Sequence, residues 1–134
     1  MRTRVPSLKF EKGFTLMELV IVMTVMAILL AMALPIYVTH VKRAKEIVLK
    51  QDLDEMRRAI DKYTIDKERA PQSLQDLVGS YLRAVPVDPI TKSADTWQVE
   101  METEAPSPDV APGIINVRSG AEGNDTSGRA YSEY

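Results

Sequence analysis

The side chain with the clearest chemical potential is a single carboxylate. Glu18 lies within residues 14–34, a run that is otherwise uncharged and almost wholly apolar. A carboxylate at the centre of a membrane-spanning helix costs roughly 2.5–3.5 kcal/mol, and less near the end of the helix. Because intramembrane carboxylates usually pair with another polar group, Glu18 is the first candidate functional residue.

Outside this run the sequence offers no constellation typical of catalysis. It contains no cysteine, which excludes disulfides, thiol chemistry and cysteine-based zinc sites, and His40 is its only histidine. No phosphate-binding loop or nucleophile elbow is present, and nothing selects a catalytic pair among the acidic residues. We therefore predict that the protein is not an enzyme and requires no cofactor.

The run that carries Glu18 has the length of a membrane helix. About 20 residues span a hydrocarbon core, and residues 14–34 match that length. Residues 1–13 hold four basic side chains against Glu11, a net charge of +3, and subtracting this from the total of −2 leaves −5 for the rest. Basic flanks stay in the cytoplasm, so the N-terminus is predicted inside and the acidic remainder outside. An acidic exported part argues against nucleic acid as a partner.

Two common targeting signals fit part of this pattern. A cleaved secretory signal would use Ala31-Met32-Ala33 as its cleavage site, but its apolar segment would exceed the usual length of about 7–15 residues. A plain signal anchor explains the span and its orientation. Neither signal explains a glutamate at position 18.

A third pattern includes the glutamate. The string Lys12-Gly13-Phe14-Thr15-Leu16-Met17-Glu18 closely resembles the class III signal of type IV pilins and of the pseudopilins of type II secretion. The resemblance implies that a prepilin peptidase cleaves after Gly13, which makes residues 1–13 a cleaved leader, and methylates the new amine of Phe14. It also implies that filament assembly depends on Glu18.

Cleavage would create a charge suited to Glu18. The Phe14 amine of an incoming subunit could meet the Glu18 carboxylate of a neighbouring subunit, which would offset the desolvation of both groups and fix the axial register. A buried ion pair is weak evidence for net stability but a plausible source of specificity. The alternative is that Glu18 lies near the helix end, reaches the lipid headgroups and has no partner.

The helix is expected to continue well beyond the membrane span. Pro35 follows the run and would bend or break a helix, and residues 35–66 then show apolar side chains at three- and four-residue spacing. One helix over residues 15–66 would be roughly 75 Å long. Its first half must therefore lie in lipid or against copies of itself, while later residues can cover its second half. The apolar stripe of this second half consists of Val41, Ala44, Val48, Leu49, Leu53, Met56, Ile60 and Tyr63.

Residues 67–134 read as a small domain with little helix. A short helix is expected between Pro71 and Gly79. Strands are predicted over residues 97–101 and 114–117, where apolar side chains alternate or cluster. The predicted fold class is α+β, with a long N-terminal helix packed against a small antiparallel sheet.

Several motifs in residues 63–134 narrow the resemblance. They are Tyr63-x-x-Asp66-x-x-Arg69-x-Pro71, Ser73-Leu74-x-Asp76-Leu77, Pro86-x-Asp88-Pro89, Trp97 and Tyr131-Ser132-Glu133-Tyr134. Together they resemble the major pseudopilin of type II secretion. The resemblance implies a pilin-like lollipop: a filament-core helix over 14–34, its amphipathic continuation over 35–66, and a periplasmic α/β domain over 67–134.

The resemblance also implies a structural role. The expected function is polymerisation into a periplasmic pseudopilus that drives export of folded proteins across the outer membrane. The expected partners are further copies of the chain, minor pseudopilins, the prepilin peptidase, and the inner-membrane assembly platform with its ATPase. Before assembly the subunit is expected in the inner membrane as a single-pass protein.

Two alternatives to this role stay open. One is a type IV pilin subunit used for surface adhesion, motility or DNA uptake. The other is an anchored binding protein that does not polymerise, for which Glu18 would be dispensable.

Well-known members of the resembled family bind calcium in an Asp-rich C-terminal loop. The corresponding segment here, residues 119–126, offers Glu122, Asn124 and Asp125 as candidate ligands. Calcium takes about six to eight oxygen ligands, and only two of these side chains are charged. A solvated turn is the simpler expectation for this segment, and calcium binding is the alternative.

Overall fold

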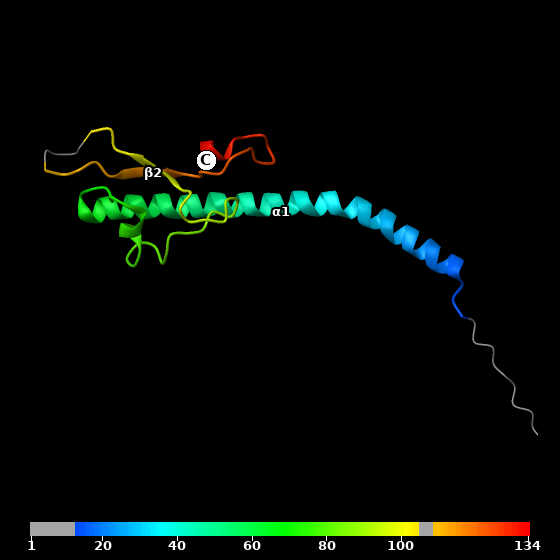
Figure 1. The fold of residues 1–134 in the computed structure, drawn as a ribbon. Helices are drawn as coiled ribbons and strands as arrows, with labels where there is room; N and C mark the ends of the chain where they lie inside the picture. The colour runs from blue at the N-terminus through cyan, green and yellow to red at the C-terminus, as the bar shows by residue number, and fades with distance from the viewer. Residues whose placement is uncertain (1–12, 105–108) are drawn as a thin grey trace, which may run out of the picture. The chain divides into compact units, whose positions relative to one another are not determined.

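The computed structural model describes residues 13–104 and 109–134. Along the chain these residues form helix α1 (Leu16–Lys67), the 3-10 helix η1 (Leu74–Leu77), strand β1 (Gln98–Met101), strand β2 (Ile114–Arg118) and the 3-10 helix η2 (Tyr131–Glu133) (Figure 1). The predicted α+β class is confirmed. The expected leader lies outside the described residues apart from Gly13. The chain divides into an N-terminal unit, residues 1–37, and a C-terminal unit, residues 38–134.

In the N-terminal unit the described residues form the first part of helix α1 and the short segment before it, and none of their side chains is buried. Helix α1 begins at Leu16, after Thr15, whose Oγ1 accepts the N–H of Glu18 at 3.2 Å as a helix cap. The large apolar side chains from Phe14 to Tyr37 are each at least 48 % exposed. By length and composition α1 is able to cross a membrane. It continues through Pro35, so the proline does not end it.

In the C-terminal unit one face of α1 is covered by the residues that follow it (Figure 1). Fully burying one such apolar side chain contributes about 1.5–3 kcal/mol, so the apolar layer stabilises the unit. The core joins side chains of α1 to side chains from η1, β2, η2 and the segments between and after them: Leu49, Leu53, Met56, Ile60, Leu77, Trp97, Ile114, Val117, Tyr131 and Tyr134.

The predicted apolar stripe of α1 is confirmed only in its second part. Val41, Ala44 and Val48 are exposed, whereas Glu46 is only 4 % exposed. The covered face of α1 has the register 46, 49, 53, 56 and 60, and the three exposed residues fall outside it. A carboxylate therefore occupies a position where the spacing alone favours an apolar side chain.

The two strands predicted from the sequence pair with each other. Strands β1 and β2 are antiparallel, and their register shifts between Glu100 and Met101. Both strands begin and end within one residue of the predicted ranges. Ile114 and Val117 of β2 are buried, while every residue of β1 is exposed. Strand β2 is therefore the strand that joins the sheet to the helix.

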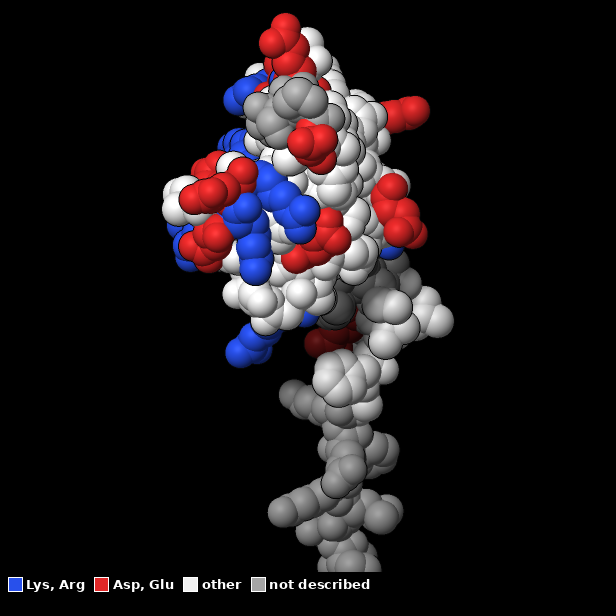
Figure 2. All heavy atoms as spheres, turned by 90° about the vertical axis from the view of Figure 1, so that its left-hand side faces the viewer, with Lys and Arg blue, Asp and Glu red and all other residues white. Residues whose placement is uncertain are grey.

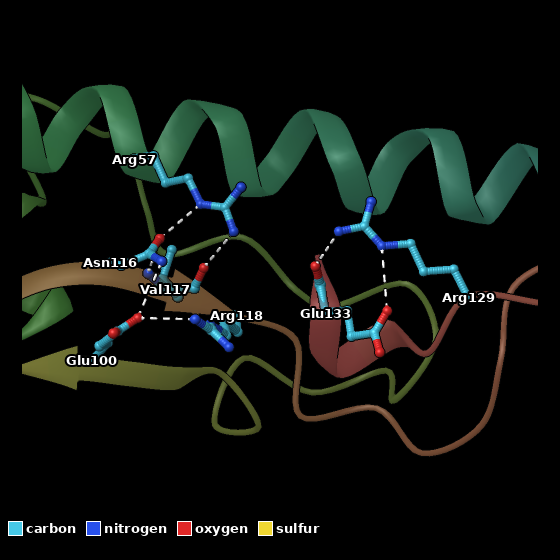
Figure 3. Close-up of polar contacts among 7 residues, drawn as sticks. All are labelled: Arg57, Glu100, Asn116, Val117, Arg118, Arg129 and Glu133. Carbon is cyan, nitrogen blue, oxygen red and sulfur yellow. Dashed lines mark hydrogen bonds and ion pairs between the residues drawn. The ribbon is translucent and has the colours of Figure 1, made fainter.

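Arg57 adds a polar attachment between α1 and β2 (Figure 3). Its Nε donates to Asn116 Oδ1 at 2.9 Å, and its Nη2 donates to the carbonyl oxygen of Val117 at 3.0 Å. Nearby, Arg118 and Glu100 form a cross-strand ion pair at 3.2 Å. Both of these side chains are about half exposed, and such pairs add at most about 1 kcal/mol. Apolar burial and Arg57 are thus the main attachments of the sheet.

The short helix expected between Pro71 and Gly79 is the single turn η1. The carboxylate of Asp76 accepts the N–H groups of Gln72 and Ser73, both at 2.9 Å. These hydrogen bonds, that from Ser73 foremost, hold the pKa of Asp76 below its ordinary value. The carboxylate thereby satisfies N–H groups that a helix start leaves without a partner.

Candidate functional site

The residues of the predicted processing site lie directly before α1. Gly13, Phe14 and Thr15 adopt no regular structure, and the side chain of Phe14 is 88 % exposed. Apart from Gly13 itself and its two chain neighbours, no described residue has an atom within 4 Å of the position that a Cβ atom would take at Gly13. The peptide bond between Gly13 and Phe14 is therefore accessible from the surface of the chain.

Glu18 lies in the first turn of α1 with its side chain exposed. The backbone N–H of Glu18 donates to the side-chain hydroxyl of Thr15. Among the described residues, no hydrogen bond to the Glu18 carboxylate is seen. The helix dipole favours a negative charge in this turn by about 0.3–1 kcal/mol, which is less than the cost of placing it in lipid. In the uncleaved chain the nitrogen of Phe14 belongs to a peptide bond, so the amine predicted to meet Glu18 does not yet exist.

Asp125 is the one candidate calcium ligand that is buried, with 7 % of its surface exposed. Its carboxylate accepts the N–H groups of Ser127 at 2.7 Å and Arg129 at 2.9 Å. It also accepts the hydroxyl groups of Ser127, at 2.6 Å, and of Tyr134. The hydrogen bonds from Ser127 and Tyr134 hold the pKa of Asp125 well below its usual range. The segment is therefore not a solvated turn throughout, as the simpler expectation had it.

The other two candidate calcium ligands are exposed. Glu122 and Asn124 lie at the surface, and the main-chain carbonyl oxygen of Asn124 accepts a hydrogen bond from Nζ of Lys42 at 2.9 Å. In the described part of the chain, no three His, Cys, Asp or Glu side chains are grouped so as to hold a metal ion. Calcium binding by this segment stays a prediction.

Sequence reasoning missed Glu46, which anchors the C-terminal loop to α1. Its carboxylate accepts the N–H of Thr126 at 2.9 Å, the hydroxyl of Thr126 at 2.7 Å and the hydroxyl of Tyr131 at 3.2 Å. The signal was present in the sequence, because Glu46 precedes Leu49 and Leu53 at helical spacing and so falls in the apolar stripe.

Asp88 has a similar role in the loop that precedes β1. It is fully buried, and its Oδ1 accepts the N–H groups of Ile90 at 2.7 Å and Thr91 at 3.2 Å. Its Oδ2 accepts the hydroxyl of Ser119 at 2.6 Å. Asp88 therefore joins the loop before β1 to the turn after β2, which gives the Pro86-x-Asp88-Pro89 motif a structural function.

The two tyrosines that contact these carboxylates stay protonated near neutral pH. Burial, followed by the hydrogen bond to Glu46, raises the pKa of Tyr131 to about 12. Burial, followed by the hydrogen bond to Asp125, also raises the pKa of Tyr134. Both phenols therefore remain hydrogen-bond donors, Tyr131 to Glu46 and Tyr134 to Asp125, throughout the physiological range.

The N-terminal residues match a known protein-family motif. Residues 8–34 match the prokaryotic N-terminal methylation motif, and this stretch contains Gly13, Phe14 and Glu18. The motif, the long apolar helix that follows it and the small antiparallel sheet give the chain a pilin-like architecture.

The chain is also similar to named proteins of secretion and fimbrial systems. It is 29 % identical over 96 residues to the type II secretion system core protein G of Klebsiella pneumoniae, covering 59 % of this chain and 69 % of that protein. The Pseudomonas aeruginosa protein of the same name is 29 % identical over 96 residues, covering 59 % and 68 %. The type IV major fimbrial protein FimA of Dichelobacter nodosus is 35 % identical over 72 residues, covering 54 % and 46 %. No solved structure matches the chain. The predicted resemblance to pseudopilins is confirmed.

Proposed function

We propose that this chain is the major structural subunit of a type II secretion pseudopilus. The observation that carries the proposal is a methylation motif joined to a helix whose large apolar side chains are exposed from Phe14 to Tyr37. A single chain leaves this surface uncovered, and packing against the same helix of other copies would cover it. Relatives named type II secretion core protein G, matched over more than two thirds of their length, favour a pseudopilus over other filaments.

Before assembly the subunit spans the inner membrane once. The apolar residues 14–34 form the span, and the basic residues 1–13 keep the N-terminus in the cytoplasm. The C-terminal unit then lies in the periplasm. The N-terminal apolar helix and the methylation motif support this arrangement.

Processing and assembly follow from the same residues. A prepilin peptidase cleaves after Gly13 and methylates the amine of Phe14, and the exposed peptide bond at this position supports the assignment. The new amine of an entering subunit pairs with the Glu18 carboxylate of a subunit already in the filament. The pairing gives the charge in α1 a partner and sets how far one subunit is displaced from the next.

The subunit supplies no energy for this process. Extraction from the membrane requires an inner-membrane platform and its ATPase, and minor pseudopilins are further expected partners. The chain itself has a structural role, in keeping with relatives that are named as secretion-system core and fimbrial proteins.

A type IV pilin subunit is the second candidate, and the similarity to FimA favours it. One pilin activity, DNA uptake, would use a basic or aromatic surface to bind the DNA. Figure 2 shows basic and acidic side chains intermixed on the face that it displays. The residues after position 13 carry a net charge of −5, which disfavours binding to nucleic acid, so we propose a filament without nucleic acid as a partner.

Deletion of the gene separates the two candidates. For a pseudopilin, we expect folded exoproteins to disappear from the medium and to accumulate in the periplasm, because only the step across the outer membrane fails. The measurement compares both fractions in deletion, complemented and parent strains. Normal secretion together with the loss of surface filaments would instead establish the type IV pilin.

A further inference from the structure

We propose that the C-terminal segment of this chain, residues 119–134, closes onto α1 without a metal ion. Two buried carboxylates, those of Glu46 and Asp125, hold the segment in its conformation by accepting hydrogen bonds from it, so no bound cation is needed for this purpose. The resembled family implies calcium in this region, and the residues present here do not fit it.

The first reason is that the oxygens of Asp125 are already occupied. The carboxylate accepts hydrogen bonds from two N–H groups and two hydroxyl groups, supplied by Ser127, Arg129 and Tyr134. Hydrogen-bond donors point their hydrogens at the oxygen lone pairs, which are the same lone pairs that a calcium ion would use. Binding of calcium to Asp125 would therefore break a network that is already satisfied.

The second reason is that Glu46 closes the same segment in the same way. It is 4 % exposed, and its two oxygens accept the N–H and hydroxyl of Thr126 and the hydroxyl of Tyr131. All of these donors are neutral. No described buried side-chain nitrogen or oxygen lacks a hydrogen-bond partner, so this segment contains no orphaned ligand aimed at an ion.

The third reason is the charge around the segment. The ammonium group of Lys42 donates to the carbonyl oxygen of Asn124 at 2.9 Å. The ring of Tyr134, whose hydroxyl contacts Asp125, has Nζ of Lys50 at 4.6 Å from its centroid and the guanidinium carbon of Arg129 at 5.3 Å. These cations lie at the carbonyl oxygen of Asn124 and at the ring of Tyr134, so they disfavour a divalent cation beside this segment.

The test is thermal unfolding of the full chain in detergent, followed by the fluorescence of Trp97. This residue is the only tryptophan of the chain and is buried in the C-terminal unit, so its signal reports that unit. We expect the same Tm in millimolar calcium chloride and in the calcium chelator EGTA. A rise of several degrees in calcium would overturn the proposal.

Two variants sharpen this test. Tyr134→Phe removes one donor to Asp125 and should lower the Tm by roughly 4–8 °C, equally with calcium and with chelator. Glu122→Gln alters an exposed candidate ligand and should change nothing in either condition. An unchanged Tm for Tyr134→Phe, or a calcium-dependent Tm that Glu122→Gln abolishes, would contradict metal-free closure.

Hydrogen exchange provides a readout that needs no variant. The amides of Thr126, Ser127 and Arg129 donate to Glu46 and Asp125, so we expect them to be protected in the wild-type chain treated with chelator. Protection that appears only after calcium is added would show that the ion closes the segment, and the proposal would fail.

Discussion

Replacing Glu18 with alanine is expected to abolish filament growth while leaving the chain in the membrane. The substitution removes the one charge of residues 14–34, so insertion becomes easier by as much as about 2.5–3.5 kcal/mol. Assembly loses the carboxylate that an incoming Phe14 amine would meet, and the register between subunits is no longer fixed. Fractionation of cells measures insertion, and electron microscopy of overexpressed filaments measures assembly.

Two further variants show whether the charge of Glu18 is the reason. Glu18→Gln keeps the size of the side chain and should fail almost as completely as alanine. Leu19→Ile keeps the apolar volume of a neighbouring exposed residue in the same turn and should leave filaments present. If Glu18 acts only through the helix dipole, its charge is worth about 0.3–1 kcal/mol, and Glu18→Gln would assemble normally. Normal filaments from Glu18→Ala would end the pairing hypothesis.

Replacing Asp88 with alanine is expected to destabilise the C-terminal unit by about 2–4 kcal/mol, because buried donors are left without an acceptor. The orphaned groups are the N–H of Ile90, the N–H of Thr91 and the hydroxyl of Ser119. Domains are stable by only about 5–15 kcal/mol, so this loss is a large share of the total. Urea unfolding followed by Trp97 fluorescence measures it.

Matched variants separate this hydrogen-bond effect from a general effect of mutating the loop. Asp88→Asn retains one carbonyl oxygen as an acceptor and should lose less stability than Asp88→Ala. Asp95→Ala removes an exposed carboxylate from the same loop and should unfold at nearly the parent urea concentration. Equal stability of Asp88→Ala and the parent chain would show that Asp88 does not organise the loop.

The regular structure could be predicted from the sequence because its signals are local. Helix α1 follows from a long apolar run and a periodic stripe, and both strands follow from short apolar patterns between turn-forming residues. Val41, Ala44 and Val48 were predicted to belong to the apolar stripe of α1, but they are exposed. Periodicity alone does not show which face of a helix later residues will cover. The covered face became clear only from the packing of β2 and the C-terminal segment against α1.

The residues of the candidate site also fall into two groups: those in a local sequence motif and those that only the fold brings together. Gly13, Phe14 and Glu18 lie in one short motif, so the sequence alone is sufficient to propose them as site residues. Glu46 and Asp125 act through donors that the fold brings to them, and the Thr126 donor of Glu46 lies 80 positions further along the chain. Such contacts have no period, and an isolated acidic residue in the sequence resembles any solvated charge.

The intact mass of the mature protein, purified from cells that contain the secretion machinery, tests the central claim most directly. That claim requires a new amine at Phe14, since this is the group that Glu18 is proposed to meet. We expect a chain that lacks residues 1–13 and carries one added methyl group. A chain that retains residues 1–13, or one that begins at Leu34 as an ordinary secretory signal would produce, would contradict it.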